Sequence, residues 1–408
     1  MKLNRSHIAL NLGTLLEYYD FVIFSMLAKS IMESLFPQLG QNNALLHFLF
    51  FSLGGVFRLL GGAIFGTIGD FFGRRTTFLY ITISMSIATF CIGMLPFTTN
   101  SFINLFLLFS LRAIQSLSFG GEIPSASTFT YETEVKKKRG SFIGLIFSGA
   151  SVGAVFATAT LSLLTLFLST SQMISWGWRL PFILGGTIGF LTLFLRNSLK
   201  ETDCFTKTIK TPHKKIPLLK KNLPTLLFAS SILIFPLSLV MLNIYLSFYL
   251  PTYFSVSLNT VYSTQTLGLI AAIFVAPLAG WLTRFFSLEK LLLSVSLSFA
   301  IVLFSIINLA IEGTYLSLSI FFIVWQTLQT SCIVWSMLYA LAKIPIEIRS
   351  MSMGIIYNFS AMLAGLVPTI ISVIYSYFNN NYLAFYVAAG IGIFSASSLL
   401  LFKNKKNF

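Results

Sequence analysis

Long apolar stretches separated by short polar connections dominate this chain of 408 residues. The stretches 222–283, 291–311 and 350–402 carry no charged residue. At about 20 residues per membrane span, they have room for two, one and two spans. The whole pattern predicts helices near 9–35, 44–67, 77–97, 102–130, 140–168, 178–196, 224–255, 263–284, 289–311, 314–340, 350–377 and 382–402. We therefore expect an all-α membrane protein with twelve transmembrane helices.

Composition and charge support this reading. The chain is 56% hydrophobic and only 10% charged, whereas soluble domains have about 25% charged residues. A net charge of +15 points to nucleic acid in a soluble protein, but here 23 of the 27 Lys and Arg lie in the termini and alternate connections. By the positive-inside rule, both termini are expected in the cytoplasm. The expected surroundings are a lipid bilayer, with no nucleic acid.

The polar segment 197–222 divides the chain into two halves of six predicted helices each. We expect a six-helix bundle over 1–196, a basic cytoplasmic linker over 197–222, and a second bundle over 223–408. The two halves show a weak internal sequence repeat at an offset near 210 residues, which aligns Arg139 with Arg349. Two bundles of this kind are typical of transporters with a site near the midplane.

The loop FGTIGDFFGRR follows the second predicted helix and contains Gly66, Asp70, Gly73, Arg74 and Arg75. Its tight turn brings the Asp70 carboxylate near basic groups and lets it cap the amino end of a neighbouring helix, where the helix dipole favours an anion. These five residues are therefore predicted to form a latch that holds one state of a two-state protein.

At this loop the chain resembles the major facilitator superfamily, except that Phe71 stands where a basic residue is usual. Further strings are similar to its metabolite/proton symporter branch, which includes proline/betaine, α-ketoglutarate, citrate and shikimate carriers. These strings are GTLLEYYDF, LRAIQSLSFGGE, WGWRLPF, LRNSLKETDCF, FYLPTYF and IRSMSMGIIYNF. The resemblance implies a monomeric carrier that moves a small-molecule substrate together with protons.

Five ionisable residues interrupt the apolar helices of the first half: Glu17, Asp20, Arg58, Arg112 and Glu122. A charge at the bilayer centre costs about 2.5 to 3.5 kcal/mol on insertion scales, so such residues are functional candidates. At about 1.5 Å per residue, Glu17 matches Arg58 in depth, and Asp20 matches Arg112. Since Glu17 and Asp20 are three apart, one acidic helix face is expected to meet both arginines.

These four midplane residues allow two interpretations. They can titrate as a coupled unit in which a proton or an anionic ligand competes for the arginines, or they can be permanent salt bridges that hold helices together. Coupling is favoured, because apolar packing can replace a purely structural pair at little cost. In the family that the chain resembles, an acid in helix one and an arginine in helix four are associated with coupling, which selects Asp20 and Arg112.

Glu122 lies further along the same predicted helix than Arg112, near the cytoplasmic face, and is expected to belong to the latch. There it can join Glu132 and Arg139 in an inner gate network with Arg74 or Arg75. The second half has no ionisable residue at mid-helix, so its substrate contacts must be neutral. Together with Arg112, the predicted substrate cavity is lined by Tyr245, Tyr249, Gln326, Gln329 and Asn358.

The sequence favours a proton-coupled importer of a small zwitterionic or anionic metabolite. A proton antiporter or uniporter of the same fold, or a nutrient-sensing receptor, are the alternatives. An enzyme is disfavoured, because the chain has no HExxH motif, no spaced nucleophile and base, and no phosphate-cradling loop. The three His residues lie at termini, helix ends or loops, so no metal site, catalytic residue or cofactor is expected.

Overall fold

Helices form the architecture of this chain, whose structure is a computed structural model. It describes residues 5–36, 44–96, 101–199, 201–202, 215–254, 256–378, 386–387 and 389–393. Within them, nine helices are long and apolar enough to cross a membrane, and no strand occurs. The last predicted helix, 382–402, lies largely outside these residues, as does much of the linker, so twelve helices stay a prediction.

Contacts divide the chain into two compact units. Unit 1 comprises 1–133, 149–213 and 346–358, and unit 2 comprises 134–148, 214–345 and 359–408. Each unit therefore takes in a short segment from the other half of the sequence, at the two places where the internal repeat aligns Arg139 with Arg349. The predicted boundary at 197–222 stays a prediction.

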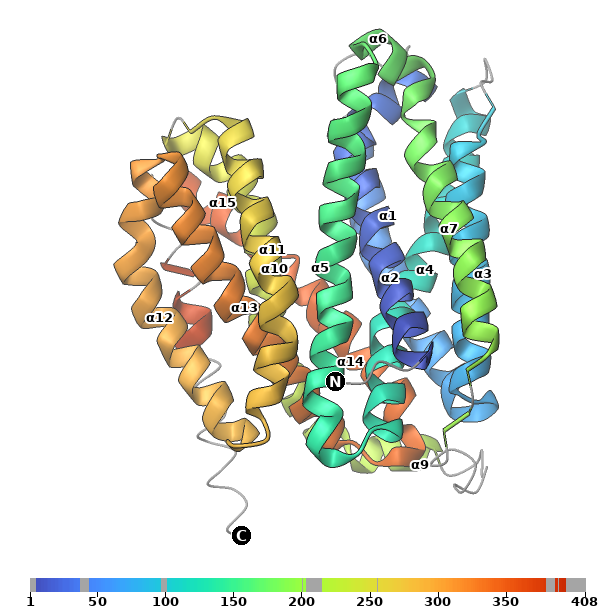
Figure 1. Ribbon diagram of the computed structural model, residues 1–408, viewed down its shortest axis with the longest axis vertical. Coiled ribbons are helices and arrows are strands. Elements are labelled where there is room, and N and C mark those ends of the chain that lie inside the picture. Colours follow the sequence, from blue (N-terminus) through green and yellow to red (C-terminus); the bar gives the residue numbers. More distant parts are fainter. Residues whose placement is uncertain are drawn as a thin grey trace. The chain divides into compact units, whose positions relative to one another are not determined.

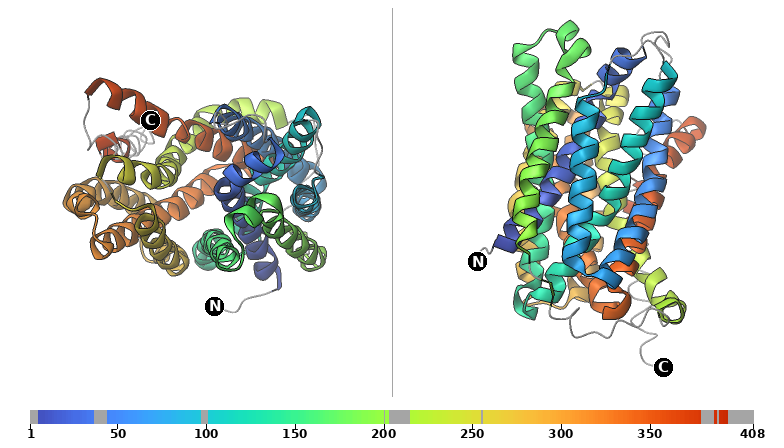
Figure 2. Two further views of the ribbon diagram at one scale, coloured as in Figure 1. Left: turned by 90° about the horizontal axis from the view of Figure 1, so that it is seen from above. Right: turned by 90° about the vertical axis from the view of Figure 1, so that its right-hand side faces the viewer.

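Unit 1 is a bundle of long helices (Figures 1 and 2). Its elements are α1 (Arg5–Leu35), α2 (Ala44–Phe72), α3 (Arg74–Gly93), α4 (Ser101–Thr133), the later part of α5 (Lys136–Phe167), α6 (Thr170–Gln172), the π-helix η2 (Met173–Gly177), α7 (Arg179–Asn197), the 3-10 helix η4 (Ile346–Ile348) and the first part of α14 (Arg349–Ala364). The most extensive pairs are α2 with α4 and α3 with α7.

Glycines let α2 and α4 approach closely. A Cβ on Gly61 would overlap the main chain of Leu117, and one on Gly120 would overlap the carbonyl of Arg58. Such small residues are typical of close helix contacts in membranes, where packing rather than the hydrophobic effect holds helices together. The contact places Arg58 on α2 beside the middle of α4.

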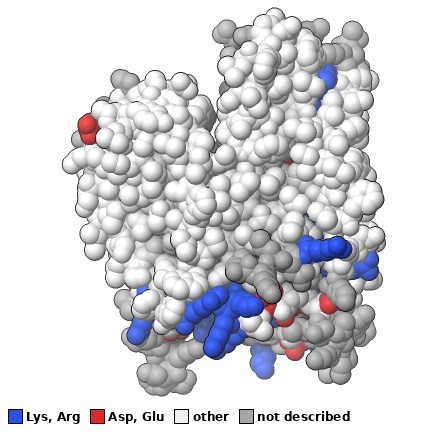
Figure 3. Space-filling view, in the orientation of Figure 1, with Lys and Arg blue, Asp and Glu red and all other residues white. Residues whose placement is uncertain are grey.

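Unit 2 contains α9 (Lys215–Lys221), α10 (Leu223–Phe254), α11 (Leu258–Leu282), α12 (Leu288–Glu312), α13 (Tyr315–Lys343), α15 (Val367–Phe378), the start of α5 and the end of α14. α13 is the central helix, because α10, α11 and α12 all pack against it. Within each unit, the exposed Lys and Arg side chains on the face shown in Figure 3 gather mainly toward one end of the helices, and the rest of that face is almost free of charge.

One helix that was predicted to be continuous is broken in the structure. The stretch 350–377 forms two helices, α14 and α15, separated by a turn at Gly365 and Leu366. Pro368 explains the break, because it lacks the amide proton that would bond to Ala364 and its ring clashes with that carbonyl. In the first turn of α15 the missing proton costs nothing.

Candidate functional site

Asp20 on α1 is buried in unit 1 and satisfied by three neighbours. One carboxylate oxygen, Oδ1, accepts hydrogen bonds from Thr89 Oγ1 (3.0 Å) and Gln115 Nε2 (2.8 Å). The other, Oδ2, lies 3.6 Å from Nη1 of Arg112. The predicted meeting of Asp20 and Arg112 is therefore present in the structure, at the junction of α1, α3 and α4.

Gln115 forms hydrogen bonds with both Asp20 and Arg112. Its amide oxygen accepts from Arg112 Nη1 (2.7 Å), and its amide nitrogen reaches both Asp20 and the hydroxyl of Thr89 (2.8 Å to each). The guanidinium carbon of Arg112 lies 3.6 Å from the ring centroid of Phe24. Arg112 Nε is buried and has no hydrogen-bond partner within the described residues, so its donors exceed what Asp20 and Gln115 take up.

Glu17 and Arg58 do not form the predicted second pair. Arg58 Nε donates to Asn358 Oδ1 (2.8 Å), and its guanidinium carbon lies 4.0 Å from the ring centroid of Phe119. Both carboxylate oxygens of Glu17 are buried, and within the described part of the chain neither accepts a hydrogen bond. Glu17 still interacts electrostatically with Arg58 and with Glu122. Equal depth along the membrane normal stays a prediction, and it does not fix the direction in which each side chain leaves its helix.

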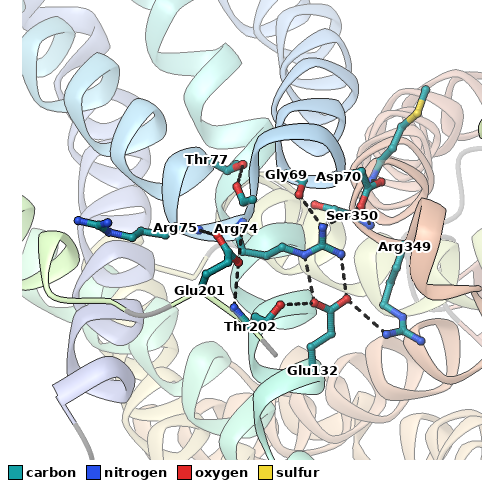
Figure 4. Close-up of polar contacts among 12 residues, drawn as sticks. Gly69, Asp70, Arg74, Arg75, Thr77, Glu132, Glu201, Thr202, Arg349 and Ser350 are labelled. Carbon is teal, nitrogen blue, oxygen red and sulfur yellow. Dashed lines mark hydrogen bonds and ion pairs between the residues drawn. The ribbon is translucent and has the colours of Figure 1, made fainter. Parts of the chain in front are cut away.

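The latch loop forms a polar network within unit 1 (Figure 4). Gly73 adopts φ 103°, a conformation that favours glycine, and α3 starts directly after it. Arg74 is buried and binds Glu132 through Nε (3.1 Å) and Nη2 (2.9 Å), while its Nη1 lies 3.1 Å from Asp70 and donates to the Gly69 carbonyl (2.5 Å).

Asp70 caps the first turn of α14, as the sequence predicted for a neighbouring helix. Its oxygens accept from the backbone amides of Ser350 (3.2 Å) and Met351 (2.8 Å). The adjacent Arg349 adds a longer ion pair to Glu132 (3.4 Å). Carboxylates at the amino end of a helix are stabilised by its unpaired amides and its dipole.

The residues after α7 complete the network. Glu201 accepts from the backbone amides of Arg74 (3.0 Å) and Arg75 (3.1 Å), and so caps α3 from 127 and 126 residues away in sequence. Thr202 Oγ1 donates to Glu132 (3.2 Å). Arg75 donates to the carbonyl and the side-chain oxygen of Asn197 (2.9 Å each).

Glu122 is not in this network, and its predicted pairing with Arg74 or Arg75 is wrong. It forms a buried bidentate ion pair with Arg196, near the end of α7. Arg196 Nη1 also donates to Thr82 Oγ1 (2.6 Å). Arg139 lies in unit 2, where its Nε donates to the Glu134 carbonyl (3.0 Å), and its place in the gate stays a prediction.

The neutral residues predicted for the substrate cavity lie mainly in unit 2. Tyr245 and Tyr249 stack along α10 with centroids 5.3 Å apart, and Tyr249 is buried. On α13, Gln326 is buried, and Gln329 accepts from Trp325 Nε1 (3.0 Å).

Asn358 belongs to unit 1, where it connects three helices. Besides accepting from Arg58, its Nδ2 donates to the carbonyls of Gly120 and Gly354 (2.7 Å each). These contacts tie α14 to α2 and α4. Elsewhere, among the described His, Cys, Asp and Glu residues, no group of three or more is placed to hold a metal ion.

A family model of the Major Facilitator Superfamily matches residues 10–367. The chain belongs to the Major Facilitator Superfamily. The resemblance found in the sequence is thereby confirmed, and the protein is a membrane transporter of this superfamily.

Its relatives include named metabolite transporters. The glycine betaine/proline/ectoine/pipecolic acid transporter OusA of Dickeya dadantii is 28% identical, over 100% of this chain and 84% of its own. The shikimate transporter of Escherichia coli is 28% identical, over 97% and 93%. The solved structure of the proton:xylose symporter XylE bound to 6-bromo-6-deoxy-D-glucose aligns with a TM-score of 0.77 at 17% identity, covering 98% of this chain and 95% of that one. At that identity, it shows the shared fold.

Four residues of the polar networks described above were not predicted from the sequence. Gln115 carried a usable signal, because it follows Arg112 by three residues and so shares its helix face. Arg196 was counted with the basic linker, although it lies in the last turn of α7, a helix whose residues between Arg179 and Arg196 are uncharged. Thr89 and Glu201 carried no local signal, since their partners are distant in sequence.

Proposed function

We propose that this protein is a secondary active transporter of a bacterial inner membrane, importing a small zwitterionic or anionic metabolite together with protons. The solute belongs to the proline/betaine or dicarboxylate class. Relatives named as transporters of glycine betaine and proline, and of shikimate, support this class, and another is named an inner membrane metabolite transport protein. The protein works as a monomer by alternating access of its two halves.

The buried Asp20–Arg112 pair is the observation that carries the proposal. A guanidinium presents a planar fork of donors that matches a carboxylate. In the structure Asp20 and Gln115 both contact one nitrogen of that fork, Nη1. When Asp20 takes a proton, the attraction between the pair is lost, and Arg112 can turn its donors to the carboxylate of a solute. Proton and solute binding then support each other.

Neutral side chains complete the proposed solute site. Tyr245, Gln326 and Gln329 offer hydroxyl and amide groups that hydrogen-bond a carboxylate without adding charge, and Tyr249 holds Tyr245 in place by stacking. Tyrosine faces also attract quaternary ammonium groups, which suits a betaine. Asn358 adds a neutral amide to the proposed site, and it is held by Arg58 and by the carbonyls of Gly120 and Gly354.

The latch network has a separate role in the proposal. Asp70, Arg74, Glu132 and Arg349 stabilise one of two conformations of the carrier, together with the glycines of the loop. Because a ligand shifts a two-state equilibrium only by its differential affinity, these contacts set how much binding energy is needed to leave that conformation.

Uptake into proteoliposomes tests the proposal. The purified protein is offered labelled proline, glycine betaine, α-ketoglutarate or shikimate, with and without an imposed inward proton gradient. We expect accumulation of at least one solute above equilibrium, abolished by a protonophore. Accumulation driven only by an outward proton gradient would indicate an antiporter, equilibration without accumulation would indicate a uniporter, and either result would overturn the symport proposal.

A further inference from the structure

A small cavity inside unit 1 connects Asp20 with a second buried ion pair. Its volume is about 20 Å³, on a scale where one water needs about 10–15 Å³. Asp20 lines it together with Glu122 and Arg196. The cavity therefore has room for one water beside the proposed coupling residue and touches ionisable groups on three helices.

The cavity wall is polar along one side of α3. Thr82, Ser86 and Thr89 all line it, and their spacing of four and three residues places them on one helix face. The seven residue steps from Thr82 to Thr89 span roughly 10 Å of helix. The two end hydroxyls contact the two ion pairs, since Thr89 donates to Asp20 (3.0 Å) and Thr82 accepts from Arg196 (2.6 Å).

Small residues on α1 and α7 keep this space open. Gly13, Gly185 and Gly189 line the cavity. A Cβ on Gly13 would overlap the side chains of Glu122 and Arg196, and one on Gly189 would overlap the hydroxyl of Ser86. Side chains at these positions would fill the gap between the two pairs.

The Glu122–Arg196 pair lies near the end of unit 1 toward which its exposed Lys and Arg side chains gather (Figure 3). Arg196 is in the last turn of α7, and its side chain reaches the carbonyls of Ala9 in α1 (3.4 Å) and Phe78 in α3 (3.5 Å), close to where those helices begin. By the positive-inside rule this end faces the cytoplasm. Both members of the pair are almost fully buried, with side chains 1% and 2% exposed.

We propose that protons released by Asp20 leave through the interior of unit 1, by way of this cavity and the Glu122–Arg196 pair. The inference rests on the proposed proton coupling and adds a route that the solute does not share. A carrier with separate exits can release its proton while the solute site is still occupied.

Each step of the route conserves the proton. The O–H bond of protonated Asp20 breaks as a water in the cavity takes the proton and passes another to a carboxylate oxygen of Glu122. The ion pair is then neutralised on the acid side, while Arg196 keeps its own proton and its bonds to Thr82. Glu122 then transfers the proton to water at the cytoplasmic end of unit 1, and the ion pair forms again.

Glu17 is the other charged group that this route must accommodate. It lies one helical turn from both Gly13 and Asp20, and it interacts electrostatically with Glu122, Arg58 and Arg196. Protonation of one carboxylate changes the energy of protonating the other. Glu17 is therefore left unchanged in the variants that test the route.

Two variants test the route in proteoliposomes. Ser86→Val fills the cavity and removes its middle hydroxyl, and Glu122→Gln keeps the shape of the side chain but cannot carry the proton. Ser84→Val is the matched control, because Ser84 is also on α3 but contacts Ser118 (2.7 Å) and does not line the cavity. Glu122→Asp, which restores a carboxylate, is the rescue.

The readout is the ratio of proton-driven accumulation to solute exchange, which needs no net proton movement. We expect Ser86→Val and Glu122→Gln to lower this ratio by a factor of about 10 or more, Glu122→Asp to recover part of it, and Ser84→Val to leave it unchanged. An unchanged ratio in both variants would overturn the route. Equal loss of exchange and accumulation in both would also overturn it, by showing a structural role. Failure of the wild type to accumulate any solute would instead refute the proposed function.

Discussion

Glu132 accepts from two arginines, and the structure predicts very different strengths for the two contacts. Arg74 binds both carboxylate oxygens at 2.9 and 3.1 Å and is 2% exposed. Arg349 reaches one oxygen at 3.4 Å and is 13% exposed. Breaking a buried pair costs about 3–5 kcal/mol, whereas exposed pairs contribute about 0.2–1 kcal/mol.

Double-mutant cycles measure the two couplings separately. We expect a coupling free energy of about 3 kcal/mol between Arg74→Gln and Glu132→Gln, and about 1 kcal/mol between Arg349→Gln and Glu132→Gln. The assay is chemical unfolding of purified protein in detergent, in which the free energy of unfolding is obtained for each single and double variant.

Arg75 provides the control for these cycles. It neighbours Arg74 but is exposed and contacts Asn197, so Arg75→Gln should show almost no coupling with Glu132→Gln. Equal couplings for Arg74 and Arg349, or a stronger one for Arg349, would refute the view that burial and bidentate geometry determine the strength of the latch.

Two further predictions concern the coupling pair and the cap of α3. Arg112→Lys should strongly reduce the initial rate of uptake, because an ammonium does not reproduce the planar fork of donors proposed to bind the solute carboxylate; wild-type uptake by this variant would remove Arg112 from the solute site. Glu201→Ala should lower the free energy of unfolding by about 1 kcal/mol, because two backbone amides at the start of α3 lose their acceptor. Asn197→Ala serves as its neighbour control, and an equal or smaller loss for Glu201→Ala would contradict the capping role.

Helix positions within the described residues were predictable, because hydrophobic length in a membrane protein is a strong signal. The break between α14 and α15 was also readable in principle from Gly365 and Pro368. It was missed because the stretch carries no charge and is hydrophobic on average, so hydropathy alone does not detect the turn.

The candidate site was only partly predictable. Depth calculated from position along each helix correctly predicted that Asp20 meets Arg112, because these side chains also face each other. It failed for Glu17 and Arg58, because Arg58 on α2 binds Asn358 instead. The partner of Glu122 was missed because Arg196 is 74 residues away, and only the packing of α7 brings it close.

Proton movement during solute entry tests the central claim most directly. Proteoliposomes without any imposed gradient are suspended in weakly buffered medium, and the transported solute is added outside. Symport through Asp20 predicts an immediate rise of external pH in wild type and none in Asp20→Asn, even where that variant still exchanges solute. Solute entry without any pH change in wild type, or an equal pH rise in Asp20→Asn, would contradict the account.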